Sequence, residues 1–122
     1  MRFSIYQDSL IGGRSYNQDR MGYCFTRDAL LMVVADGMGG HAAGDLASKI
    51  VVTEVFSELT FRRNDMENDA GQMAQTLRGA ANAANDCLAS YVAENPETRG
   101  MGATLVTCVI VNDALHWISV GD

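Results

Sequence analysis

Apolar and polar positions divide the chain into a strand-rich first part, a helical middle and a strand-rich end. Residues 3–11 alternate weakly before Gly12-Gly13, which predicts a strand that ends in a turn. Apolar runs at 21–26 and 30–36 predict two further strands. The second run is continuous rather than alternating, which is typical of a strand covered on both faces.

The middle of the chain has helical periodicity. Apolar residues recur at spacings of three and four between residues 43 and 59, which predicts a helix with one apolar side. Residues 60–65 are polar and predict a loop. A second helix should follow, with Asp65 as its N-cap, and end at Pro96.

The last part predicts a strand, a turn and a strand. β-branched residues dominate 103–111, Asn112-Asp113 is a turn signal, and an apolar segment returns at 115–120. The whole order is three strands, two helices and two strands, so we expect an α+β fold.

Composition narrows the class of protein. With 48% hydrophobic and 20% charged residues, the 122-residue chain is typical of a small globular domain or part of one. Its net charge of -6 argues against a nucleic-acid partner. Three cysteines without a CxxC pair favour reduced thiols over a disulfide framework or zinc site. No signal peptide or membrane-spanning stretch is present, so we expect a cytoplasmic protein without a membrane partner.

The segment Asp36-Gly37-Met38-Gly39-Gly40-His41 is the first candidate for chemistry. Asp36 lies at the end of a buried strand, where a carboxylate is costly without a counter-charge. The glycines allow the backbone to approach a ligand closely, and His41 opens the next helix. Hard oxygen ligands of this kind suit Mg²⁺ or Mn²⁺.

Three interpretations of this segment compete. It is a structural turn between strand and helix, a dinucleotide-binding turn, or a metal site. The dinucleotide interpretation fails because a second helix, rather than a strand bearing an acid, follows the first helix. The segment alone does not decide between the turn and the metal site.

Other segments add weight to the metal site. Arg14 lies five residues before Asp19, and an arginine there can place a phosphate clamp beside a metal-directed carboxylate. A lone Arg or Asp in a loop is, however, most often only solvated. Further along, residues 100–105 form a glycine turn that enters a strand, and Val120-Gly121-Asp122 places another acid at a strand end.

Together these segments resemble the type 2C, or PPM, metal-dependent Ser/Thr protein phosphatases, especially their compact bacterial branch. The stretches that carry the resemblance are Arg14-x-x-Asn17-Gln18-Asp19, Val34 to Gly44, Gly102-Ala103-Thr104 and Val120-Gly121-Asp122. The resemblance implies an αββα sandwich, in which two antiparallel sheets are flanked by helices. Because such catalytic domains run to about twice this length, we expect residues 1–122 to be the N-terminal portion of one domain, apparently truncated.

The resemblance implies hydrolysis of phosphoserine and phosphothreonine by a hydroxide activated by two, or three, Mg²⁺ or Mn²⁺ ions. Asp36 would bridge two ions and the Gly37 carbonyl would bind one of them. Asp19 and Asp122 would be further metal ligands. Thr104 belongs to a motif that is mainly structural and stays outside the catalytic set.

The catalytic set implied by the resemblance is Asp36, His41 and Arg14. Arg14 would hold the substrate phosphate. His41 would be the general acid for the leaving Ser or Thr oxygen. Phosphorylated proteins, and the pathway of a cognate Ser/Thr kinase, are the implied partners.

Two departures from the family pattern matter. Many members carry Glu at the position of Gln18, and a neutral amide is a weaker metal ligand, so Asp19 is the preferred metal-directed acid. The rest of the family domain carries two further metal-binding acids. We therefore expect residues 1–122 alone to bind metal weakly and to have little phosphatase activity.

Two alternatives remain. The first is a catalytically silent regulatory or binding domain on the same scaffold. Gln18 and the length of the chain favour it, whereas Arg14, Asp36 and His41 argue against it. The second and weaker alternative is a nucleotide-binding module.

Overall fold

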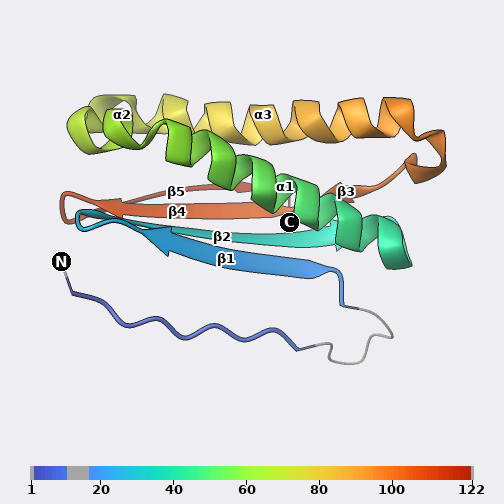
Figure 1. Ribbon diagram of the computed structural model, residues 1–122, viewed down its shortest axis with the longest axis horizontal. Helices are drawn as coiled ribbons and strands as arrows, with labels where there is room; N and C mark the ends of the chain where they lie inside the picture. The colour runs from blue at the N-terminus through green and yellow to red at the C-terminus, as the bar shows by residue number, and fades with distance from the viewer. Residues whose placement is uncertain (1, 11–16, 122) are drawn as a thin grey trace.

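The computed structural model describes residues 2–10 and 17–121 (Figure 1). These residues form one antiparallel sheet with helices on one face. The elements in chain order are β1 (Asp19–Phe25), β2 (Ala29–Met38), α1 (His41–Phe61), α2 (Arg63–Asn68), the 3₁₀ turn η1 (Ala70–Gln72), α3 (Met73–Glu94), the 3₁₀ turn η2 (Pro96–Thr98), β3 (Gly102–Ala103), β4 (Leu105–Val111) and β5 (Ala114–Val120).

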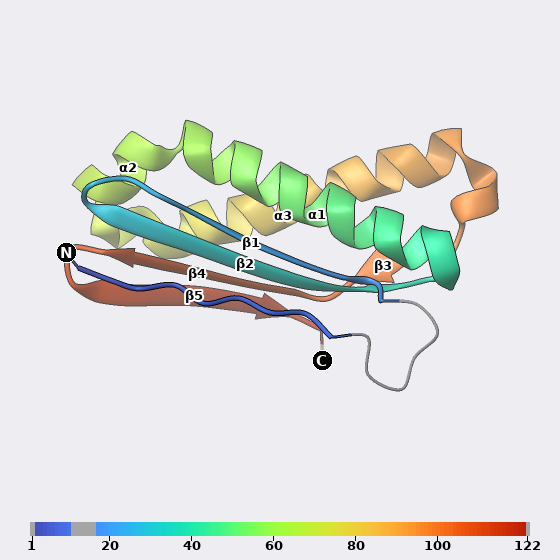
Figure 2. The same cartoon turned by 60° about the horizontal axis from the view of Figure 1, so that its bottom comes forward.

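The sheet has the order β1-β2-β4-β5, and the short β3 continues the pairing along the last residues of β2. The helices α1 and α3 lie side by side over one face, as Figures 1 and 2 show. The predicted α+β class is confirmed. In the described part of the chain it takes the form of one sheet layer and one helix layer, which is half of the expected sandwich.

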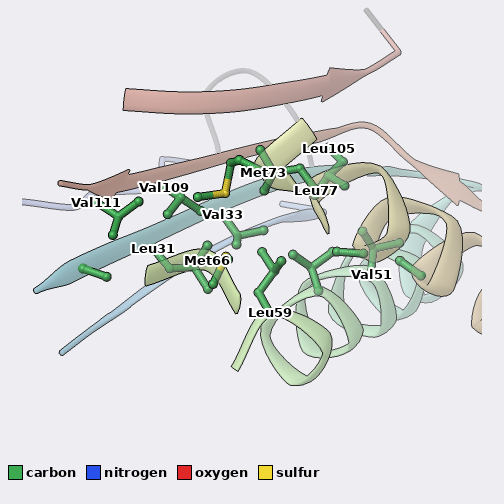
Figure 3. Close-up of a cluster of buried hydrophobic side chains, with 14 of the residues drawn as sticks. Leu31, Val33, Val51, Leu59, Met66, Met73, Leu77, Leu105, Val109 and Val111 are labelled. Carbon is green, nitrogen blue, oxygen red and sulfur yellow. The ribbon is translucent and has the colours of Figure 1, made fainter. Parts of the chain in front are cut away.

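The hydrophobic core lies between this sheet and these helices (Figure 3). Side chains alternate between the two faces of a strand, so every second residue of β2 and β4 points toward the helices. These residues pack against one side of α1 and α3. The core residues include Leu31, Val33, Leu105, Val109 and Val111 from the strands and Val51, Val55, Leu59, Met66, Met73 and Leu77 from the helices.

The other face of the sheet stays open within the described part of the chain. Most side chains there are apolar, and Phe25 and Trp117 are 60% and 63% exposed. Residues 2–10 run across part of this face (Figure 2), where Phe3 meets Phe25 edge to face with ring centroids 5.2 Å apart. The expectation that the strand at 30–36 is covered on both faces therefore holds on the helix side, while Val34 on the open side is 45% exposed.

Three sequence predictions about the elements are wrong. Residues 3–10 lie in no strand, and residue 11 lies outside the described residues. The predicted loop at 60–65 is mostly helical, because α1 runs to Phe61 and α2 begins at Arg63. Asp65 consequently lies in the first turn of α2 instead of capping the long second helix, which begins at Met73.

Packing explains why residues of the predicted loop at 60–65 are helical. Met66 of α2 is buried, so this short helix contributes to the core although its sequence is mostly polar. The predicted turn at Asn112-Asp113 and the predicted helix end at Pro96 are confirmed, whereas the predicted turn at Gly12-Gly13 lies outside the described residues. Asn112 and Asp113 have φ angles of 54° and 61°, the left-handed values of a tight hairpin turn, and α3 ends just before Pro96. No helix in the described part of the chain is long and apolar enough to cross a membrane.

The end of β2 lies unusually close to the start of α1. A Cβ atom on Gly37 would collide with the main-chain carbonyl of Gly44 and would lie 2.9 Å from the Gln18 carbonyl oxygen. A Cβ atom on Gly44 would in turn collide with the side-chain amide of Gln18. Gly37 is therefore required by the space between strand and helix rather than by its φ angle, whereas a side chain at position 44 would require the Gln18 side chain to move.

The close approach predicts opposite effects for two glycine-to-alanine changes. Gly37→Ala should destabilise the protein by about 1–3 kcal/mol or more, because the obstructing atoms belong to the main chain. Gly79→Ala is the matched control in α3, where an added Cβ would have no neighbour within 4 Å. It should stabilise the protein by up to about 1 kcal/mol through helix propensity. Urea unfolding of both variants measures the difference, and equal stabilities would contradict the packing described.

Candidate functional site

The segments singled out in the sequence meet at one end of the sheet. Asp19 begins β1, Asp36 lies near the end of β2, and Thr104 lies between β3 and β4. Gly121 follows β5 and lies beside Thr104, since a Cβ on Gly121 would be 3.1 Å from the Thr104 methyl carbon. Segments that are far apart in the sequence thus lie together at one end of the sheet.

Asp19 and Asp36 are direct cross-strand neighbours. The Gly37 N–H donates to the Gln18 carbonyl at 3.1 Å, and this bond flanks the pair rather than joining it. The two aspartates therefore form a non-hydrogen-bonded pair, the kind in which Cα atoms are closest, at about 4.5 Å. Their side chains leave the sheet on the same face.

That face is the open one. The neighbours of Asp36 in β2, Ala35 and Gly37, are buried toward the helices, while Asp36 itself is exposed. Asp19 is partly buried on the same side as Asp36. Two carboxylates placed directly opposite each other repel, and a divalent cation between them would remove this repulsion.

The donor set fits Mg²⁺ or Mn²⁺. These ions accept one or two protein carboxylates together with water and phosphate oxygens, so a closed protein cage is not required. Within residues 2–10 and 17–121, no group of three or more His, Cys, Asp or Glu side chains is arranged to hold a metal ion. The described part of the site therefore offers a carboxylate pair that can share an ion with other ligands.

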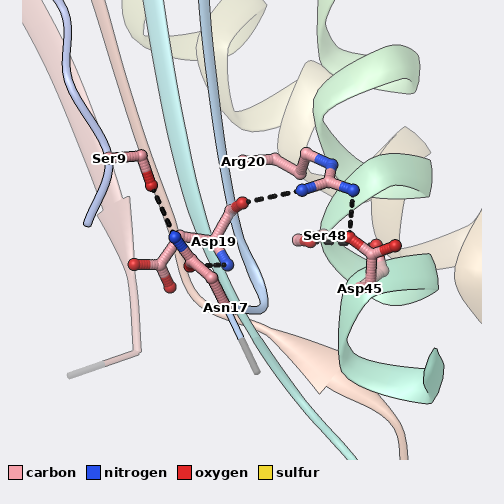
Figure 4. Close-up of polar contacts among 6 residues, drawn as sticks. All are labelled: Ser9, Asn17, Asp19, Arg20, Asp45 and Ser48. Carbon is pink, nitrogen blue, oxygen red and sulfur yellow. Dashed lines mark hydrogen bonds and ion pairs between the residues drawn. The ribbon is translucent and has the colours of Figure 1, made fainter. Parts of the chain in front are cut away.

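Gln18 and Arg20 point to the opposite side of β1 from Asp19. The Gln18 side chain packs against Gly44 at the start of α1. Figure 4 shows Arg20 reaching toward α1, where its guanidinium forms an ion pair with Asp45. Asp19, rather than Gln18, thus shares a face with Asp36, which supports the preference for Asp19 as the metal-directed acid.

Hydrogen bonds hold both main-chain polar groups of Asp19, its N–H and its carbonyl (Figure 4). Its N–H donates to Asn17 Oδ1 at 3.0 Å, and its carbonyl accepts from Arg20 Nη1 at 3.2 Å. Asn17 Nδ2 also donates to Ser9 Oγ at 2.9 Å, which ties residues 2–10 to the site. Sequence analysis missed Arg20 and Asp45, because nothing in the spacing of two opposite charges 25 positions apart signals a contact.

The remaining predicted site residues are only partly described. His41 begins α1, directly after Gly39 and Gly40 with φ angles of 126° and 77°, but its side chain lies outside the described residues. Arg14 and Asp122 also lie outside the described residues. The structure therefore brings together the predicted residues Asp19, Asp36 and Gly37. The metal-binding and catalytic roles of these three residues, like those of His41, Arg14 and Asp122, stay predictions.

Other features of the molecule lie away from this end of the sheet. An open polar cleft of about 420 Å³ is lined by residues of α1, α2 and α3 and of the turns between them, and none of the predicted site residues lines it. Burial raises the pKa of the Cys24 thiol. Cys24 lies near the far end of β1, so this shift has no bearing on the aspartate pair.

Comparison with known proteins supports the resemblance to the type 2C phosphatases. The sequence model of the protein phosphatase 2C family matches residues 7–122. Serine/threonine protein phosphatase PstP of Mycobacterium tuberculosis is 34% identical over 94 residues, which cover 77% of this chain and 17% of that protein. Serine/threonine phosphatase stp of Listeria monocytogenes is 31% identical over 113 residues, which cover 89% of this chain and 43% of that protein.

A solved structure agrees in fold. The crystal structure of the catalytic domain of PstP in complex with two manganese ions superimposes with a TM-score of 0.68 at 31% identity, covering 89% of this chain and 43% of that chain. The chain thus spans less than half the length of these relatives. Its sequence motifs, its fold and these matches give one conclusion: the chain belongs to the protein phosphatase 2C family.

Proposed function

We propose that the protein is a metal-dependent protein serine/threonine phosphatase and that residues 1–122 supply the N-terminal part of its active site. The observation that carries this proposal is the cross-strand pair of Asp19 and Asp36 on the open face of the sheet. The family membership supports it, because relatives such as PstP and stp are named serine/threonine phosphatases.

In this proposal Mg²⁺ or Mn²⁺ ions bind between Asp19 and Asp36, with the Gly37 carbonyl and Asp122 as further ligands. The relative PstP has been solved with two manganese ions. Such ions, when bound, supply an activated water and neutralise charge on the phosphoryl oxygens. The protein's own contribution is to hold the two carboxylates on one face at a fixed spacing.

The substrate side of the site is assigned to Arg14 and His41. The Arg14 guanidinium would bind two phosphoryl oxygens and orient the phosphorus for in-line attack by water. The bond between phosphorus and the Ser or Thr oxygen breaks in this step. The His41 imidazole, which can exchange protons near neutral pH, would donate a proton to that leaving oxygen. The products are inorganic phosphate and the free hydroxyl side chain.

The substrates in this proposal are phosphorylated proteins from the pathway of a Ser/Thr kinase. A protein with a net charge of -6 repels phosphate at long range. Local cations and Arg14 would reverse the sign of the field at the site itself. Phosphate recognition therefore depends on the loaded metal site rather than on the overall charge of the surface.

A silent binding domain on the same scaffold is the second candidate. The observation that favours it is the packing of Gln18 against Gly44, at a position where many family members have Glu. A domain of this kind would still bind phosphoproteins but would not hydrolyse them. The following substitution separates the two candidates.

Asp36→Asn should lower Mn²⁺-dependent phosphatase activity of the natural protein by at least about 100-fold, since a direct ligand should matter no less than its supporting residues. Its melting temperature should change little, because the Asp36 side chain is exposed and asparagine has nearly the same shape. Asp86→Asn, on the exposed side of α3, removes the same charge as a control and should leave activity unchanged. Phosphopeptide hydrolysis measures the activity of both variants, and thermal unfolding measures their melting temperatures. Retained activity in Asp36→Asn would refute the site assignment, and an inactive parent would favour the binding domain.

A second prediction concerns residues 1–122 expressed by themselves. The aspartate pair contributes too few ligands within the described residues to retain ions tightly. Hydrolysis of p-nitrophenyl phosphate in the presence of Mn²⁺ should therefore stay near the background rate. Robust Mn²⁺-dependent turnover by residues 1–122 would show that the ligands outside this chain are dispensable.

A further inference from the structure

We propose that Thr104 is a positioning residue for Asp36, and that its hydroxyl group is needed for tight metal binding rather than for folding. The inference rests on the proposed function, because it assigns Asp36 to the metal site. It concerns a residue that the sequence motif alone marks only as structural.

Thr104 binds both main-chain polar groups of Asp36. The Asp36 N–H donates to Thr104 Oγ1 at 3.2 Å, and the Asp36 carbonyl accepts from the Thr104 N–H at 2.9 Å. In an ordinary antiparallel ladder the first of these bonds would go to the Thr104 carbonyl. The hydroxyl group thus replaces a main-chain acceptor at the point where the strand pairing passes from β4 to β3.

The other neighbouring strand, β1, does not hold the main-chain polar groups of Asp36. Asp19 and Asp36 form a non-hydrogen-bonded pair, so β1 offers no partner to the Asp36 N–H or carbonyl. The direction in which the Asp36 carboxylate leaves the sheet therefore depends on the two bonds to Thr104. Loss of the hydroxyl would free the Asp36 N–H and leave the bond from the Thr104 N–H as the one that still holds the Asp36 main chain among the described residues.

Thr104 also contacts the segment that leads to the last predicted ligand. Its methyl carbon lies where a Cβ on Gly121 would be 3.1 Å away, and Gly121 has a φ of 88°, which favours glycine. The methyl group of Thr104 thus faces the turn after β5, while its hydroxyl group holds Asp36. This arrangement is suited to setting the relative position of two strand ends that carry acids.

Folding alone does not require the hydroxyl. Asp36 is exposed, so water can satisfy its N–H if Thr104 no longer does. A nearby threonine offers the contrast: Thr107 in β4 is 1% exposed and its Oγ1 has no hydrogen-bond partner in the described part of the chain. Removal of that hydroxyl should not weaken the protein.

The test compares Thr104→Val, Thr104→Ser and the control Thr107→Val in the natural protein. Valine keeps the shape of threonine and loses the hydroxyl, whereas serine keeps the hydroxyl. The readouts are the Mn²⁺ dissociation constant from calorimetry, hydrogen exchange of the Asp36 amide in metal-free protein, and the melting temperature. Thr104→Val should weaken Mn²⁺ binding about 10-fold, accelerate exchange at Asp36 and shift the melting temperature by less than about 5 °C.

Thr104→Ser should restore both the Mn²⁺ affinity and the slow exchange, and Thr107→Val should match the parent in both. If Thr104→Val binds Mn²⁺ as the parent does, or if Thr104→Ser loses as much affinity as Thr104→Val, the inference is overturned while the proposed function stands. A parent protein that binds no Mn²⁺ overturns the proposed function and this inference with it. Should Thr104→Val fail to fold, Thr104→Ala against Thr104→Ser provides the same comparison.

Discussion

The strand register that places Asp19 directly opposite Asp36 is the constraint around which this end of the molecule is organised. Like charges on directly opposed residues disfavour the pairing of two strands. The β1–β2 hairpin nevertheless holds them in register over its whole length, and the core behind β2 stabilises that register from the helix side. In the proposed function, a divalent cation would bind between the two carboxylates and offset the repulsion between them.

The supporting contacts act on the main chain rather than on the carboxylates. Asn17 and Arg20 hold the polar groups of Asp19, and Thr104 holds those of Asp36. The close contact of Gly37 with the first turn of α1 then sets the distance between the strand and the helix. The two side chains are therefore directed by rigid elements, which is the condition for a metal site of defined geometry.

The features best predicted from the sequence are those that depend on neighbouring residues in the chain. The strand, turn and helix around Asp36 and the hairpin turn at Asn112 follow from apolar runs and turn residues, and the structure confirms both. The shared face of Asp19 and Asp36 required the register of the sheet, which no local pattern supplies. For the same reason the role of Thr104 was missed, since its hydroxyl bonds to a residue 68 positions away.

The wrong predictions have a common physical origin in tertiary packing. A polar stretch became helix α2 because Met66 finds a place in the core, and the weak alternation of residues 3–10 produced no strand. Those residues instead lie across an apolar face of the sheet, where Phe3 contacts Phe25. Periodicity reports which side of an element is apolar, but it does not report which surface is available to cover it.

The central claim is that the aspartate pair holds a divalent cation, and anomalous X-ray diffraction from crystals of the natural protein grown with Mn²⁺ tests it most directly. We expect an anomalous peak on the open face of the sheet, within about 2.0–2.3 Å of carboxylate oxygens of both Asp19 and Asp36. A map in which manganese occupies other sites while this pair has no peak would contradict the account.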